Sequence, residues 1–158
     1  MTDAPMTVLA DPAVIAEEFA EALPGTFTHA DAIAVGEEIV RLARSRDLAV
    51  AVSVMLGDHE VFRLALPGTS TGNDAWIRRK RNVAELTGEP SFLVGQRLAA
   101  RGLGPVTPEM PEADYAPHGG AVPILVDGAL LGSVTVSGLP PQDDHALVLE
   151  ALRGALPR

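Results

Sequence analysis

The chain has 158 residues, 47% of them hydrophobic, no cysteine and a formal net charge of −9. This length suits a single domain over residues 1–158, with a core at about 10–156. The lack of cysteine excludes disulfides and cysteine-bound metal, and the acidic charge argues against a nucleic-acid or anionic-membrane partner. No basic, apolar leader opens the sequence, and no apolar run approaches the roughly 20 residues that span a bilayer. We therefore expect a cytoplasmic protein without a membrane partner.

Helix caps and turn residues delimit the elements of the first half. Asp11 followed by Pro12 opens a helix, and Thr28 caps a second, longer one. Gly57-Asp58 separates two runs of strand-forming residues and predicts a hairpin. The expected elements are helices at about 12–23 and 29–46 and strands at about 48–56 and 60–66.

Two more helices and a loop precede a second hairpin. Asn73 is the expected cap of a helix that ends near Thr87, and Ser91 starts another that ends near Arg101. Residues 102–117 contain four prolines and two glycines, which predicts an ordered loop rather than a linker. The last helix is expected at about 141–155.

The segment around Asp127-Gly128 predicts the second hairpin. Alternating apolar runs flank this dipeptide, which suits a two-residue type I′ turn because both central residues need positive φ. A regular register from that turn pairs His118 with Ser137 and places His118, Thr135 and Ser137 on one face. Polar side chains would therefore converge where the hairpin meets the last helix, and we expect a site there.

Lys80 is the single lysine among 12 basic residues. On a helical wheel it projects from the centre of its helix's apolar face, beside Trp76 and Val83. A buried ammonium needs an anionic partner or a ligand. Two interpretations stay open: a structural ion pair with Asp144, or an anion-binding lysine that holds a carboxylate or propionate.

Two further groups of residues could serve the same site. His118 is followed by Gly119 and Gly120, whose N–H groups could form an anion-binding nest or could simply lead into a strand. Asp144 and His145 start the last helix at the edges of its apolar face, where the helix dipole alone favours acidic groups.

Three other chemistries fit the residues less well. A nucleophilic triad of His118, Ser137 and Asp144 lacks a sharply exposed serine and an oxyanion hole, so no catalytic residue is assigned. A metal site made of His118, His145 and Asp144 lacks a local spacing motif. The basic run 78–81 is one short cluster on an acidic chain and does not predict nucleic-acid binding.

Three segments carry a family resemblance: residues 73–83 (NDAWIRRKRNV), 115–124 (YAPHGGAVPI) and 132–152 (GSVTVSGLPPQDDHALVLEAL). They resemble the heme-degrading-domain family, which includes HbpS, GlcG and the C-terminal domain of PduO, and within it an uncharacterised small-protein branch. The resemblance covers roughly residues 10–156. It implies a profilin-like fold and heme or iron as the ligand.

The order of elements predicts an α+β fold, an antiparallel sheet with helices packed on it. The resemblance makes this a profilin-like, three-layer α/β/α arrangement. The high apolar content and the two apolar faces of the second hairpin predict a homodimer or higher oligomer. Helix 91–101 is the candidate interface element, through Phe92, Leu93, Val94 and Leu98.

Two functional hypotheses follow. The first is an oligomeric module that binds a small anionic or tetrapyrrole-like ligand, with heme or iron implied by the resemblance alone. The second is a non-catalytic structural or interaction protein whose oligomer is the functional unit. The residues do not decide whether the chain is an enzyme. The candidate ligand-binding residues are Trp76, Lys80, His118, Gly119, Gly120, Thr135, Ser137, Asp144 and His145.

Overall fold

The computed structural model describes residues 4–157. Along the chain its elements are α1 (Pro12–Ala22), α2 (His29–Ser45), β1 (Ala51–Leu56), β2 (His59–Ala65), α3 (Thr71–Thr87), α4 (Ser91–Ala100), β3 (Ala121–Val126), β4 (Ala129–Ser137) and α5 (Pro141–Ala155). The elements expected from the sequence are present in the expected order, and their bounds differ by a few residues.

Side-chain caps fix where the helices begin. At α1, Asp11 accepts a hydrogen bond from a first-turn amide, and at α2, Thr28 and Asp31 form a reciprocal capping box. The prediction that Asn73 caps α3 is wrong, because Ser70 is the cap. Asn73 is the third residue of the helix, and its side-chain oxygen accepts from the Ser70 amide in a second capping box.

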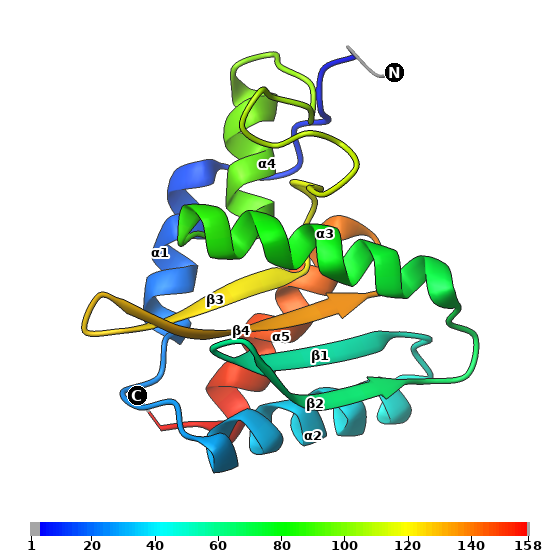
Figure 1. The fold of residues 1–158 in the computed structure, drawn as a ribbon, viewed down its shortest axis with the longest axis vertical. Helices are drawn as coiled ribbons and strands as arrows, with labels where there is room; N and C mark the ends of the chain where they lie inside the picture. Colours follow the sequence, from blue (N-terminus) through cyan, green and yellow to red (C-terminus); the bar gives the residue numbers. More distant parts are fainter. Residues whose placement is uncertain (1–3, 158) are drawn as a thin grey trace.

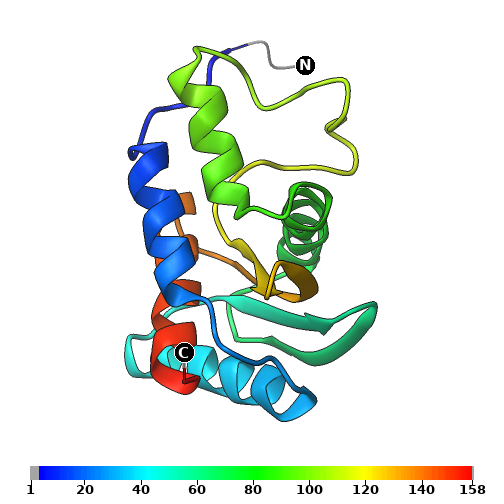
Figure 2. The same cartoon turned by 90° about the vertical axis from the view of Figure 1, so that its left-hand side faces the viewer.

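One four-stranded antiparallel sheet, in the order β2-β1-β4-β3, forms the middle layer. Helices α2 and α5 pack on one face and α3 lies across the other (Figures 1 and 2). Helices α1 and α4 pack against each other beside the β3 side of the sheet. This confirms the α+β class and its three layers. Within residues 4–157, no helix has the length and apolar content needed to cross a membrane.

The turn of the second hairpin agrees with the sequence, but the register does not. Asp127 and Gly128 have φ of 51° and 79°, as a type I′ turn requires. Beyond Leu125 the pairing shifts, and Ile124 lies opposite Gly132. One extra residue on β4 therefore forms a β-bulge.

The bulge moves the predicted pairs by one residue. Val122 pairs with Val134 instead of Ser133, and His118 lies outside β3, in the turn before it. The physical reason is a contact between the two hairpins. The carbonyl of the extra residue, Leu131, accepts a hydrogen bond of 2.8 Å from the amide of Gly57 in the first hairpin's turn.

The two faces of the sheet carry different side chains. The face toward α2 and α5 contributes valines such as Val52 and Val134 to the main core. The face toward α3 carries small hydroxyl side chains, including Ser53, Ser133 and Thr135, all 0% exposed. Among the described residues, the hydroxyls of Ser133 and Thr135 have no hydrogen-bond partner. Small side chains on this face let α3 lie close to the sheet.

The proposed interface role of α4 is wrong. Phe92 and Leu93 pack against Ile15 of α1, while Leu98 packs against Val83 and Met110. These apolar side chains are needed inside the monomer, where they join α4 to α1 and to α3. Self-association remains a prediction without an assigned interface.

Candidate functional site

Four segments meet beyond the end of β4. They are the N-terminal half of α3, the turn 118–120, the end of β4 and the first turn of α5. The sequence places one candidate residue or more on each, and the fold brings these segments together. The geometry separates the candidates into a buried, paired group and a group that lines open cavities.

Lys80 lies at the centre of the buried group and is 3% exposed. Its ammonium donates to the carbonyls of Gly119 (3.0 Å) and Val136 (2.6 Å) and to Oδ2 of Asp144 (3.2 Å). An ammonium has three N–H donors, so each has a protein acceptor. The ion-pair interpretation of Lys80 fits this geometry, since direct binding of an anion would require one of the three acceptors to be displaced.

Asp144 is the matching acceptor and is 2% exposed. Besides Lys80, it accepts from the amides of Leu139 (3.0 Å) and Gly138 (3.3 Å). Burial raises the pKa of Asp144, and the Lys80 ammonium and the two amides oppose that shift. Burial likewise lowers the pKa of Lys80, against the opposing effect of Asp144. The pair joins α3, the turn 118–120, β4 and α5 at one point.

Close packing explains the two glycines after His118. A Cβ on Gly119 would lie 2.0 Å from the carbonyl oxygen of Pro141 in α5. A Cβ on Gly120, whose φ is +139°, would lie 2.4 Å from Nζ of Lys80. The glycines therefore give room to the first turn of α5 and to the ammonium. This supports the alternative in which they lead into the strand rather than forming an anion-binding nest.

His118 differs from the buried pair because its imidazole is half-buried and borders open space. Its ring makes an edge-to-face contact with Trp76, with centroids 5.6 Å apart. Arg79 lies 4.9 Å from the centroid of the Trp76 ring on that indole's face. Burial lowers the pKa of His118, and the positive charges of Lys80 and Arg79 lower it further. The imidazole is therefore neutral at neutral pH, the form that binds metals.

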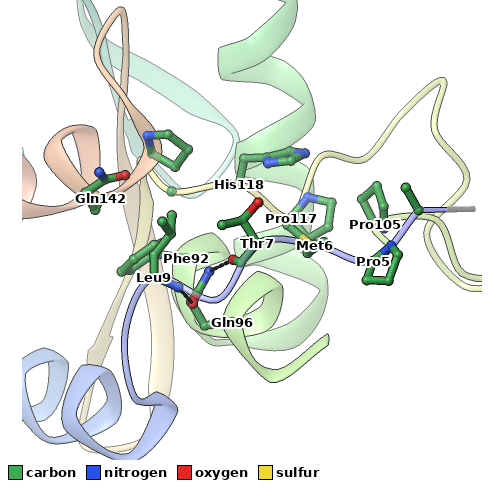
Figure 3. A pocket seen from close by; sticks show the side chains of 13 residues that line it. Pro5, Met6, Thr7, Leu9, Phe92, Gln96, Pro105, Pro117, His118 and Gln142 are labelled. Atoms are coloured by element: carbon green, nitrogen blue, oxygen red, sulfur yellow. Dashed lines mark hydrogen bonds between the residues drawn. The ribbon is translucent and has the colours of Figure 1, made fainter. Parts of the chain in front are cut away.

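Three cavities meet at His118. The apolar cavity, about 420 Å³, lies between the N-terminal segment, α4 and the His118 turn (Figure 3). The polar cavity, about 320 Å³, lies above the Lys80–Asp144 pair and is also lined by Trp76 and Ser137. The loop cavity, about 630 Å³, lies between α3 and residues 105–117. Pockets of roughly 300–1,000 Å³ are typical of small-molecule sites.

The structure brings most of the sequence-predicted site residues together. Six of them line the polar cavity: Trp76, Lys80, His118, Gly119, Ser137 and Asp144. Gly120, Thr135 and His145 line none of the three cavities. Thr135 lies under α3, opposite Ala121 and Ser53, two residues before Ser137 on the same face of β4.

His145 is buried in α5, 6% exposed, and its ring lies 5.0 Å from that of Phe92. Its Nδ1 has no hydrogen-bond partner within residues 4–157. Burial lowers the pKa of His145 to about 4. The proposed metal site with His118 and Asp144 is not supported, because the described part of the chain contains no group of three or more acidic or histidine side chains able to hold a metal ion.

Several cavity residues carry no signal that the sequence could reveal. The one hint for Gln96 is a polar residue inside an apolar helix pattern, and only the structure shows that it is buried (3% exposed). It binds the N-terminal segment, which is far from it in the sequence. Asn73 donates to the hydroxyl of Ser137 at 3.2 Å, a contact between two residues 64 positions apart.

Comparison with known proteins adds independent findings. The model of a family described as "Haem degrading protein HbpS-like" matches residues 27–153. A UPF0303 protein of Streptomyces avermitilis is 49% identical over 134 residues, which cover 84% of this chain and 82% of that protein.

Solved structures share the fold. The crystal structure of the Ybr137w protein superposes with a TM-score of 0.82 at 27% identity, covering 92% of this chain and 87% of that one. The crystal structure of a PduOC–heme complex has a TM-score of 0.64 at 16% identity, covering 83% of this chain and 95% of that one.

Proposed function

Because the chain belongs to the HbpS-like haem degrading protein family, we propose that it is a binding module for a planar, tetrapyrrole-like ligand, with His118 as the residue that ligates the iron of heme. Heme as the ligand rests on the family and on the fold shared with the PduOC–heme complex. We also propose that the chain is one domain and that it self-associates.

The position of His118 is the observation that carries this proposal. The half-buried imidazole of His118 makes no hydrogen bond within residues 4–157, whereas the buried Lys80 and Asp144 beside it are fully paired. Its ring borders all three cavities, and its pKa is lowered. A neutral imidazole beside open space can act as an axial ligand.

The residues around His118 fit such a ligand. The apolar cavity is lined mainly by apolar side chains, among them Met6, Leu9, Phe92 and Pro105. Heme needs an apolar slot of this kind beside its axial histidine. On the other side of His118, the loop cavity has Arg78 and Arg79 in its wall. Both guanidinium groups already bond within the chain, Arg78 to Asp114 and Arg79 to backbone carbonyls, so they carry no part of this proposal. Heme iron, when bound, would supply redox and oxygen chemistry.

Lys80 and Asp144 have a supporting role in this proposal. The ammonium holds the Gly119 carbonyl, so the pair fixes the turn that carries His118. Lys80 also adds positive charge near the imidazole and helps to keep it neutral. The pair therefore positions the ligating residue without contributing a free donor of its own.

The test is a hemin titration followed by absorption. Wild-type protein should shift the Soret band of hemin with saturation, and His118→Ala should abolish the shift while the protein stays folded by circular dichroism. His59→Ala, an exposed histidine in β2, is the matched control and should bind like the wild type. An equal shift in His118→Ala and wild type would refute His118 as the ligand.

One observation favours the second candidate function, a structural or interaction protein whose oligomer is the functional unit. The Lys80–Asp144 cluster is fully paired within the chain, as expected of a group that stabilises a fold. If this were the whole role of the cluster, sedimentation would reveal a stable oligomer, and neither hemin nor protoporphyrin would change the absorption or the oligomer mass.

A further inference from the structure

Gln96 is a buried amide that bonds two ways to the start of the chain. Its Oε1 accepts from the amides of Leu9 (2.7 Å) and Ala10 (3.0 Å), and its Nε2 donates to the carbonyl of Thr7 (3.1 Å). Figure 3 shows the bonds from Gln96 to Thr7 and Leu9, which join α4 to the N-terminal segment that crosses it. A glutamine on an otherwise apolar helix face thus satisfies both ends of its amide through one segment.

Residues 4–10, the N-terminal strap, form one wall of the apolar cavity. Ala4, Pro5, Met6, Thr7 and Leu9 line it, opposite His118 and Phe92. Without the strap this space would be an open surface on α4 and the His118 turn. The strap therefore decides whether the His118 side of the molecule is enclosed.

Hydrogen bonds and only a little apolar packing hold the strap in place. Val8 is 64% and Leu9 44% exposed, while Met6 and Ala10 are half-buried against small apolar clusters. Four hydrogen bonds tie residues 4–10 to the rest of the described chain, and three of them pass through Gln96. The fourth joins the Met6 amide to the Leu103 carbonyl at 2.8 Å. Segments with few buried apolar contacts open locally at low free energy.

Gly95, the residue before Gln96, lies where both the strap and the segment leading to His118 contact α4. A Cβ on Gly95 would lie 2.0 Å from the carbonyl oxygen of Pro117 and 3.1 Å from Cε of Met6. The strap, α4 and the residue next to His118 therefore meet at Gly95. One dipeptide of α4 sets the distance between the strap and His118.

We propose that Gln96 is a positioning residue that holds the N-terminal strap as a removable wall of the apolar cavity, so that a planar apolar ligand at His118 enters and leaves when the strap detaches. This inference rests on the proposed function, since the ligand is the one assigned to His118. It adds that the strap controls access to the apolar cavity and that Gln96 sets how firmly the strap is held.

The test compares two variants with a matched control. Gln96→Met keeps the volume of the buried side chain and removes three hydrogen bonds. Leu9→Pro removes one of the same bonds from an exposed residue, where the core is not at risk. Glu17→Met is the control, because Glu17 is an exposed residue of α1 that lines none of the three cavities. For each protein, amide hydrogen exchange is followed at Ala10, whose amide every variant retains, and hemin release is followed into excess apomyoglobin.

In Gln96→Met, exchange at Ala10 should rise roughly ten-fold and hemin release should accelerate to a similar degree, roughly ten-fold. Leu9→Pro should move both quantities in the same direction, and Glu17→Met should change neither. Faster exchange with unchanged hemin release would overturn the strap as a gate.

The outcomes separate the two proposals. If His118→Ala still binds hemin but Gln96→Met releases hemin faster, the strap stands and His118 ligation fails. If His118→Ala abolishes binding and Gln96→Met releases hemin at the wild-type rate, the ligand site stands and the strap fails. Wild-type protein that binds no hemin overturns both.

Discussion

The buried Lys80–Asp144 pair and the His118 rim lie side by side but differ in how their polar atoms are used. All three N–H groups of the Lys80 ammonium donate to protein acceptors, and Asp144 accepts three hydrogen bonds. His118 makes a ring contact with Trp76 and otherwise borders three cavities. Buried polar groups are normally paired, and Lys80 and Asp144 follow this rule, whereas the half-buried imidazole of His118 faces open space; this is why the proposal assigns the ligand to His118.

This difference shows that position alone is a poor guide to role. Lys80 and His118 both line the polar cavity, and the sequence makes both of them candidates for binding the same ligand. They differ in their hydrogen bonds: every donor of Lys80 has a protein acceptor, whereas the His118 ring makes no hydrogen bond in the described chain. If this difference reflects role, substitutions at the pair should lower stability and substitution of His118 should lower ligand binding.

The largest effect is expected for Lys80→Met. This change keeps much of the side-chain volume but leaves the Asp144 carboxylate buried without its cation, which typically costs 3–5 kcal/mol, or about ten degrees or more in a thermal melt of a domain of this size. Asp144→Asn and the double variant complete the cycle, and the two single losses should not add. An unchanged melting midpoint in Lys80→Met would mean that the ammonium serves a ligand instead.

The next effect depends on pH and concerns His145. Its pKa is lowered to about 4 in the folded protein, while the unfolded chain binds a proton at the ordinary value of about 6.5. Stability should therefore be fully present above pH 6.5 and should fall as the pH drops toward 4, by about 3 kcal/mol between pH 7 and pH 4.

The matched comparison for this prediction is His145→Leu, which also removes the unpartnered Nδ1. At pH 7 this variant should be at least as stable as the wild type, because a buried unsatisfied group is lost. Its urea midpoint should depend less on pH over the acid range. The same pH dependence in both proteins would show that His145 is not held neutral.

Gly119→Ala is expected to have an intermediate effect. The added Cβ would clash with the backbone of Pro141, which cannot give way like a side chain, so a loss of roughly 1–3 kcal/mol in urea denaturation is expected. Gly72→Ala, in the first turn of α3, is the control. Its Cβ would meet its nearest neighbour at 3.4 Å, and no loss is expected there. Equal stability of both variants would contradict the close packing of Gly119 on α5.

The smallest stability effect is expected for His118→Ala, which loses mainly the edge-to-face contact with Trp76, worth roughly 1 kcal/mol or less. Its effect on hemin binding should nevertheless be the largest of the series. His145→Leu should keep the Soret shift, because His145 lines none of the three cavities. If His118→Ala were strongly destabilised, His118 would have a structural role like that of Lys80 and Asp144.

Local sequence signals predicted the helices and strands correctly. The predicted register of the second hairpin was wrong because it depends on a contact between residues distant in the sequence. The caps at Asp11 and Thr28 and the Asp127-Gly128 turn act over a few residues, so the sequence reveals them. The bulge at Leu131 depends on a hydrogen bond from Gly57 of the other hairpin. No pattern within one strand pair contains that information.

The same division holds for the candidate site. The helical wheel predicts that Lys80 is buried, because the apolar face of α3 is continuous, and the structure confirms the burial. Whether Lys80 is free or paired depends on Gly119 and Val136, which are distant in the sequence. Gln96 and the strap were missed for the same reason. Their ligand-related roles stay predictions.

The strap has a practical consequence for how the protein is handled. The strap and the end of α5 lie toward opposite ends of the molecule (Figure 1). After α5 the carbonyl of Pro157 accepts a hydrogen bond of 3.4 Å from the amide of Gly25, and neither residue lines a cavity at His118. An affinity tag at the N-terminus is attached only a few residues before the strap, which is one wall of the apolar cavity, and can pull on the strap or obstruct the cavity. A tag at the C-terminus leaves that wall as it is, so apparent ligand affinities from the two tagged forms should differ.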